Sequence, residues 1–136
     1  VMERTNIRNM PAETLQPVPS IVVADLSFIS LSQVLPALIA NAALDADFLL
    51  MVKPQFEVGK DSLGAGGVVR DPELRRDAIR KVVDSGAQLG LGCNGVVASA
   101  LPGPKGNVEY FVWLKKGGAT ISDKEIEDAI AKGPQS

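Results

Sequence analysis

Apolar positions in this sequence follow two different spacings. Continuous apolar runs at residues 21–24 and 48–52 are typical of parallel strands that are buried on both faces of a sheet. Between the two runs, apolar residues from Leu31 to Ala42 recur at helical spacing, which predicts an amphipathic helix. A strand, a helix and a second strand in this order predict a βαβ unit.

The second half of the sequence continues this alternation. Asp71 followed by a proline is a favourable helix start, so we expect a helix from Asp71 to about Leu89. Strands are predicted at residues 95–99 and 108–114, and a short helix at 122–132, where a Ser-x-x-Glu capping box marks the beginning. Alternating strands and helices indicate an α/β fold with a largely parallel sheet.

The direction of the last predicted strand follows from the length of its connection. Residues 100–107 join it to the preceding strand, and a parallel crossover needs roughly a dozen residues or more. If these two strands are neighbours, the last one must therefore run antiparallel. Asp25 and Lys53 then follow the ends of parallel strands, while Glu109 lies at the beginning of the reversed strand. We expect all three at one edge of the sheet, where open α/β sheets bind ligands.

Each of these three residues also has a simpler interpretation. Asp25 could only cap the helix that follows it, and Lys53 could be a surface lysine whose stem lies along the strand end. Glu109 is harder to explain in this way. It interrupts an apolar strand on the face of Phe111 and Trp113, an unexpected place for a merely solvated carboxylate.

Length and charge limit the possible functions. The chain has 136 residues and a formal net charge of −2, so it fits one globular domain without an overall basic field. Nucleic-acid binding would depend on a local patch. Basic residues in loops and first helical turns could form a phosphate-contacting rim or an ordinary solvated surface, and Lys60, Arg70 and Lys105 are expected nearest the sheet edge. The others are Arg4, Arg8, Arg75 and Arg76.

Several kinds of chemistry are excluded or disfavoured. With no histidine and the single Cys93, the chain has no Ser-His or Cys-His pair and no internal disulfide, and we expect no metal site. A G-x-G-x-x-G pattern at residues 90–95 follows a predicted helix and opens a strand, the reverse of a dinucleotide site. Gly59 and Gly64 have the spacing of a P-loop, but the required Lys-Ser/Thr pair does not follow them.

We find no targeting signal at the beginning of the chain or in its uncharged stretch, residues 26–44. The charged beginning at Val1 is not a signal peptide, and it starts within a pattern, which suggests a piece of a longer protein. Residues 26–44 contain no charge, but their helical spacing indicates an amphipathic helix rather than a membrane span. We therefore expect a cytoplasmic protein.

Five motifs in this order resemble the later half of the hemolysin A (TlyA) family. They are Glu3–Arg8, Ala24–Leu31, Val52–Gly59, Gly66–Pro72 and Gly103–Tyr110. The resemblance implies an FtsJ-type RNA methyltransferase, which methylates ribose 2′-hydroxyls of ribosomal RNA with S-adenosylmethionine. The implied fold is a partial Rossmann-like methyltransferase sheet, mostly parallel with an antiparallel last strand.

FtsJ-type enzymes use a Lys-Asp-Lys-Glu tetrad, and the resemblance gives this chain three of its members. By motif position, Asp25, Lys53 and Glu109 match the second, third and fourth members. The first lysine belongs before Val1, as do the glycine-rich unit that cradles the methionine part of the cofactor and an S4-like RNA-binding domain. Residues 1–136 would then be the C-terminal part of one FtsJ-like domain.

The resemblance also implies binding residues and partners. Cofactor contacts are expected from Glu3, Asn6, Asp25, Leu26 and Ser27, and RNA contacts from Lys60, Arg70 and Lys105. Ribosomal RNA or ribosomal subunits are the expected partners, without DNA or membrane. Without the first half, we expect neither tight binding of S-adenosylmethionine nor methyl transfer by this chain alone. Phe56 could stack on the target base or pack in the core.

Two other functional classes compete with the enzyme. One is a non-catalytic interaction module whose exposed sheet edge pairs with a second copy. The other is a membrane-active cytolysin, as the hemolysin name suggests.

Overall fold

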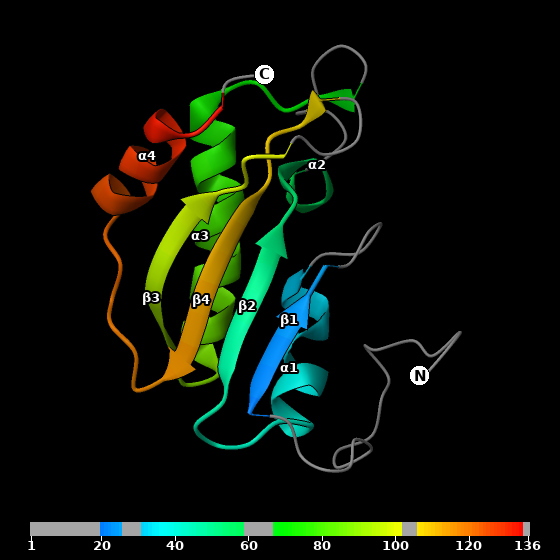
Figure 1. The fold of residues 1–136 in the computed structure, drawn as a ribbon, viewed down its shortest axis with the longest axis vertical. Helices are drawn as coiled ribbons and strands as arrows, with labels where there is room; N and C mark the ends of the chain where they lie inside the picture. Colours follow the sequence, from blue (N-terminus) through cyan, green and yellow to red (C-terminus); the bar gives the residue numbers. More distant parts are fainter. Residues whose placement is uncertain (1–19, 26–30, 59–66, 102–105, 135–136) are drawn as a thin grey trace.

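The computed structural model describes residues 20–25, 31–58, 67–101 and 106–134. Figure 1 shows their helices and strands, which follow the chain in the order β1 (Ile21–Ala24), α1 (Leu31–Ala40), β2 (Asp47–Val52), α2 (Pro54–Glu57), α3 (Pro72–Gln88), β3 (Leu91–Ala98), β4 (Tyr110–Lys116) and α4 (Asp123–Lys132).

The four described strands form one sheet in the order β1-β2-β4-β3. β1 is parallel to β2, and β4 is antiparallel to both of its neighbours, β2 and β3. The predicted α/β fold and the predicted reversal of the last strand are therefore confirmed. β1 and β3 are the edge strands of this sheet, and self-association through an edge stays a prediction.

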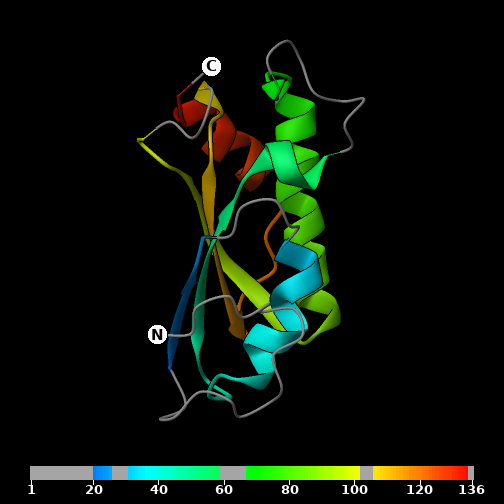
Figure 2. The same ribbon diagram turned by 90° about the vertical axis from the view of Figure 1, so that its right-hand side faces the viewer.

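The described helices cover only one face of the sheet. In Figure 2, α1 and α3 both lie on the same side of the strands, and α4 adds Ile126 and Ile130 to the same core. Residues such as Leu50 point into this core, whereas Ile21 and Val23 on the opposite face are 62% and 66% exposed. The prediction that both apolar runs are buried on both faces is wrong, because no described helix covers the second face.

The helix ends follow the predicted sequence signals. The Asp71 side chain accepts a hydrogen bond from the Glu73 backbone N–H at 2.8 Å, as an N-cap should. Ser122 and Glu125 form the predicted capping box at the beginning of α4. Both helices therefore begin where local sequence alone places them.

The G-x-G-x-x-G pattern is part of a turn and a strand. Gly90 follows α3 with φ of +87°, a left-handed conformation that favours glycine, and β3 begins at the next residue. At Gly92, a Cβ atom would lie 2.1 Å from the carbonyl oxygen of Gly118, so the two chain segments approach too closely for a side chain. The pattern follows a helix and opens a strand, as the sequence predicts.

Among the described residues, no helix is both long and apolar enough to cross a membrane. The uncharged stretch contributes α1, whose buried side is formed by Leu31, Val34, Leu35, Ala37 and Leu38.

One-sided burial predicts unequal effects for two adjacent leucines of β2. Leu50→Ala removes a fully buried side chain and should lower the free energy of unfolding by about 2–5 kcal/mol. Leu49→Ala, on the open face, should lower it by about 1 kcal/mol or less. Chemical denaturation of both variants measures the difference, and equal losses would mean that something covers both faces.

Trp113 on the open face is hydrogen-bonded to a carboxylate. Its indole Nε1–H donates to Asp47 Oδ1 at 2.8 Å, and Lys115 Nζ lies 3.4 Å from the same oxygen. The Trp113 hydrogen bond, with a further contribution from the Lys115 charge, holds the pKa of Asp47 below its ordinary value. The stability that Asp47 contributes is thus present above its unfolded-state pKa and is lost as the pH falls through its folded-state pKa.

The single tryptophan makes this titration observable. We expect Trp113 fluorescence to change as Asp47 is protonated, at a pH below the ordinary aspartate pKa of about 3.9. Asp47→Asn should remove this transition, while Asp45→Asn should leave it in place. A fluorescence titration measures both, and an unchanged transition in Asp47→Asn would contradict the assignment.

Candidate active site

Strand register brings the two catalytic candidates Lys53 and Glu109 together. The antiparallel ladder of β2 and β4 ends with Val52 opposite Tyr110, so one further step sets Lys53 opposite Glu109. Asp25 lies one residue beyond the end of β1, whose register with β2 is parallel. All three residues therefore lie at the edge formed by the carboxyl ends of β1 and β2, as predicted.

Lys53 and Asp25 form an ion pair. Lys53 Nζ lies 2.5 Å from Asp25 Oδ1, and the lysine side chain is 8% exposed while the aspartate side chain is 56% exposed. A buried amine that contacts a partly exposed carboxylate differs from the surface lysine of the simpler interpretation. The first described amide of α1, that of Leu31, is bound by Glu57 rather than by Asp25.

Glu109 is the buried carboxylate of the site, at 5% exposed. Gln55 Nε2 donates to Glu109 Oε2 at 3.1 Å, and the Glu109 main-chain carbonyl accepts from the Ser99 N–H at 2.8 Å. The side chain thus bonds to α2, and the backbone bonds to the end of β3. Glu109 therefore links α2, which follows β2, to the residue that follows β3.

A proline sets the geometry of the segment that carries Lys53. Pro54 has no N–H to extend the ladder, and it favours an extended conformation in the residue before it. Lys53 has φ of −108° and ψ of 100°, and Pro54 begins the one-turn helix α2. Lys53, Gln55 and Glu57 all lie in the five residues that follow β2, and the last two belong to α2.

Glu57 anchors the turn through a buried carboxylate. Its Oε2 accepts from the Leu31 N–H at 3.0 Å, and its Oε1 lies 3.7 Å from Lys81 Nζ. Lys81 Nζ also donates to the Glu57 carbonyl oxygen at 3.2 Å. Glu57 thereby joins α2 to the beginning of α1 and to α3. No role was predicted for Glu57, although its place between the apolar residues Phe56 and Val58 is a sequence signal for a buried acid.

Two further buried polar residues hold the segment before α3. Asn107 Oδ1 accepts from the Val69 N–H at 2.9 Å, and its Nδ2 donates to the Gly67 carbonyl at 3.1 Å. Arg75 Nε donates to the Val69 carbonyl at 3.1 Å and is buried. Placing Arg75 in a phosphate-contacting rim or on a solvated surface is therefore wrong. Burial raises the pKa of the Tyr110 phenol, and the neighbouring Arg75 opposes this rise.

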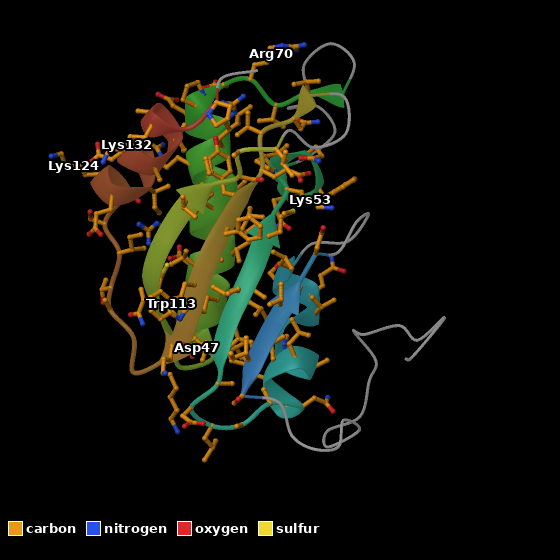
Figure 3. All side chains as sticks on the ribbon, viewed as in Figure 1. Asp47, Lys53, Arg70, Trp113, Lys124 and Lys132 are labelled. Atoms are coloured by element: carbon orange, nitrogen blue, oxygen red, sulfur yellow. The ribbon has the colours of Figure 1, made fainter. Side chains whose placement is uncertain are left out.

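The other binding candidates are largely outside the described residues. Among the described ones, Asp25 lies at the site, and Figure 3 shows Arg70 toward the same end of the molecule as Lys53. The half-buried side chain of Phe56 belongs to α2. The candidates that lie outside the described residues are Glu3, Asn6, Leu26, Ser27, Lys60 and Lys105.

Other groups in the described part of the chain lie away from this chemistry. There, no cluster of three or more His, Cys, Asp or Glu side chains could hold a metal ion. Cys93 is buried, its Sγ donates to the Gly95 carbonyl at 3.4 Å, and burial raises the pKa of its thiol. A hollow of about 730 Å³ lies between β3 and α4, and neither Lys53 nor Glu109 lines it.

The groups of the site that could take part in a reaction are one amine and two carboxylates. An amine can accept a proton from a hydroxyl when it is neutral, and carboxylates can hold it in a fixed orientation. With no histidine in the sequence, Lys53 is the described side chain at this edge that could act as a nitrogen base.

The buried Glu57 carboxylate gives a stability prediction. Glu57→Ala should lower the free energy of unfolding by about 1–3 kcal/mol, because it leaves the buried Leu31 N–H without its acceptor. Glu57→Gln keeps an acceptor oxygen and should lower it less. Asp128→Ala, an exposed acid of α4, is the control and should have little effect. Chemical denaturation tests the order, and a Glu57→Ala variant as stable as the control would contradict it.

Known proteins similar to this chain are RNA methyltransferases and proteins described as hemolysins. A sequence profile described as FtsJ-like methyltransferase matches residues 1–116. The 16S/23S rRNA (cytidine-2′-O)-methyltransferase TlyA of Mycobacterium tuberculosis is 51% identical over 139 residues, covering 98% of this chain and 52% of that protein. The 23S rRNA (cytidine-2′-O)-methyltransferase TlyA of Campylobacter jejuni is 35% identical over 115 residues, covering 84% of this chain and 44% of that protein.

A solved structure agrees with the same relationship. A protein of Lactococcus lactis, described as a candidate hemolysin, matches with a TM-score of 0.87 and 37% identity, covering 96% of this chain and 64% of that one. The chain spans about half the length of the curated relatives it matches.

Proposed function

The chain belongs to the FtsJ-like methyltransferase family, and we propose that it is the C-terminal part of one methyltransferase domain that methylates ribose 2′-hydroxyls of ribosomal RNA. The ion pair between Lys53 and Asp25 is the observation that carries this proposal. It sets a buried amine at the sheet edge where α/β enzymes bind their ligands. The ribosomal RNA methyltransferases among its relatives support the substrate class.

Lys53 is the proposed base. The amine accepts the proton of the ribose hydroxyl at Nζ while the ribose oxygen forms its new bond to carbon. S-adenosylmethionine, when bound, would supply the electrophilic methyl group, and the electron pair of its carbon–sulfur bond would remain on sulfur. Lys53 can accept a proton only when it is neutral, and a nearby positive charge favours that form.

The two carboxylates orient Lys53 rather than activate it, because negative charge favours the protonated amine. Asp25 holds Nζ directly, and Glu109 lies opposite Lys53 by strand register. Positioning can supply a large part of a rate acceleration by itself. In this proposal Asp25 and Glu109 act chiefly by fixing where the amine meets the hydroxyl.

The described residues fit the cofactor in part. Asp25 has a partly exposed carboxylate at the carboxyl end of a strand, which can accept a hydrogen bond from an amino or hydroxyl group of a ligand. The further proposed cofactor contacts are Glu3, Asn6, Leu26 and Ser27. Arg70, with Lys60 and Lys105, is the proposed contact to RNA phosphates, which suits a chain that carries a net charge of −2 and can attract RNA only locally.

A joined protein tests this function. This chain is fused to the preceding part of the mycobacterial relative, and methyl transfer from radiolabelled S-adenosylmethionine to ribosomal subunits is measured. Lys53→Ala should lower kcat by roughly 10²-fold or more, since it removes the base, and should leave cofactor binding nearly unchanged. Lys116→Ala, an exposed lysine at the other end of the sheet, is the control.

Two outcomes would contradict the proposal. Full turnover by the Lys53→Ala protein would remove Lys53 from the mechanism. Transfer above background by residues 1–136 alone would contradict the expectation that this part needs the other half of the domain.

A further inference from the structure

Gln55 is a polar residue at the site that contacts the buried Glu109. It is the second residue of α2, and its Nε2 donates to Glu109 Oε2 at 3.1 Å. Within the described part of the chain, this is the hydrogen bond that the Glu109 carboxylate accepts from a side chain. A carboxylate that is 5% exposed therefore depends on a single amide for its orientation.

Among the described residues, the oxygen of the Gln55 amide has no hydrogen-bond partner. Gln55 Oε1 is buried and accepts no hydrogen bond from the described residues. A buried acceptor without a donor is unfavourable, and folded proteins retain few of them. A residue selected only for packing would not leave its carbonyl in this state.

The charge of Glu109 explains why the amide keeps this orientation. Turning the amide by half a rotation would place Gln55 Oε1 against Glu109 Oε2, and two acceptors repel each other. With the NH₂ group toward the carboxylate, the amide satisfies the ionised acid and leaves its own oxygen unpaired. The contact thus fixes the position of the Glu109 carboxylate at the expense of the Gln55 carbonyl.

Gln55 and Lys53 are also held as one unit. Both lie on the short segment that the buried Glu57 joins to α1 and α3. Glu109 directly precedes β4, which begins at Tyr110 and pairs with β2. The hydrogen bond between Gln55 and Glu109 therefore links the segment that carries the Lys53 amine directly to the second acid.

We propose that Gln55 is a positioning residue for the reaction: it holds the Glu109 carboxylate in place so that this acid, with Asp25, orients Lys53. The inference rests on the proposed function and adds to it a residue outside the Asp25, Lys53 and Glu109 set. Gln55 acts through Glu109 and touches no reacting atom in this assignment.

The experiment uses the joined protein and two substitutions at Gln55. Gln55→Met keeps the length of the side chain without the amide, and kcat should fall by roughly 10²-fold, the size expected when a reacting group is misplaced. The KM values for S-adenosylmethionine and for ribosomal subunits should stay within about twofold, since binding groups are untouched. Gln88→Met, an exposed glutamine at the end of α3, is the matched control.

The second substitution, Gln55→Glu, keeps the shape and places a like charge beside Glu109. At neutral pH the two carboxylates repel each other, so kcat should fall, and lowering the pH should recover part of it by protonating one of the pair. The acid side of the pH–rate profile should then differ from that of the Gln55 protein. A purely structural role would not produce this pH dependence, and the measurement stands even if Gln55→Met folds poorly.

A double-mutant cycle completes the test. Because Gln55 acts through Glu109, adding Gln55→Met to a Glu109→Gln protein should lower kcat little below that of Glu109→Gln alone. An unchanged kcat and pH profile in both Gln55 variants, in an enzyme that Lys53→Ala inactivates, would overturn the role of Gln55 and leave the proposed function intact. An enzyme that Lys53→Ala does not inactivate would overturn the proposed function itself.

Discussion

The antiparallel pairing of β2 with β4 is the constraint on which the site depends. Because β4 runs in reverse, its first residue, Tyr110, pairs with Val52 at the end of β2, so that Lys53 and Glu109 follow this last pair at the same edge of the sheet. A shift of one residue in this ladder would move every side chain of β4 to the other face of the sheet. The core residues Val112 and Leu114 forbid such a shift, since it would expose them. Core packing and site geometry are therefore set by the same register.

Two of the buried charged side chains, Lys53 and Glu57, lie in the few residues that follow β2. Lys53 is held by Asp25, and Glu57 is held by the Leu31 N–H and Lys81. Charges taken out of water need such partners, and losing one partner costs more than the pair contributes. The short helix α2 is thus fixed by polar contacts to α1 and α3 more than by its own length, which is below that of a self-supporting helix.

Much of the fold and part of the site could be predicted from the sequence, because the signals concerned are local. The Asp71 cap, the Ser122 capping box and the reversal forced by residues 100–107 depend on neighbours in the chain. The meeting of Asp25 and Lys53 followed from strand direction. The partners of Arg75 and Glu57 were not predictable in this way, because they include backbone groups of segments that only the folded chain brings near them. The burial of only one face of the sheet could not be predicted either, because an apolar run does not indicate which face of its strand the helices will cover.

The uncovered face of the sheet also affects how the folded chain responds to temperature. Side chains such as Ile21, Val23 and Val97 are already in contact with water before unfolding begins. The heat capacity increase on unfolding comes mainly from apolar surface that becomes newly hydrated, and this face adds little to it. The described fold should therefore show a smaller heat capacity change per residue than a sheet covered on both sides, and a flatter dependence of its stability on temperature.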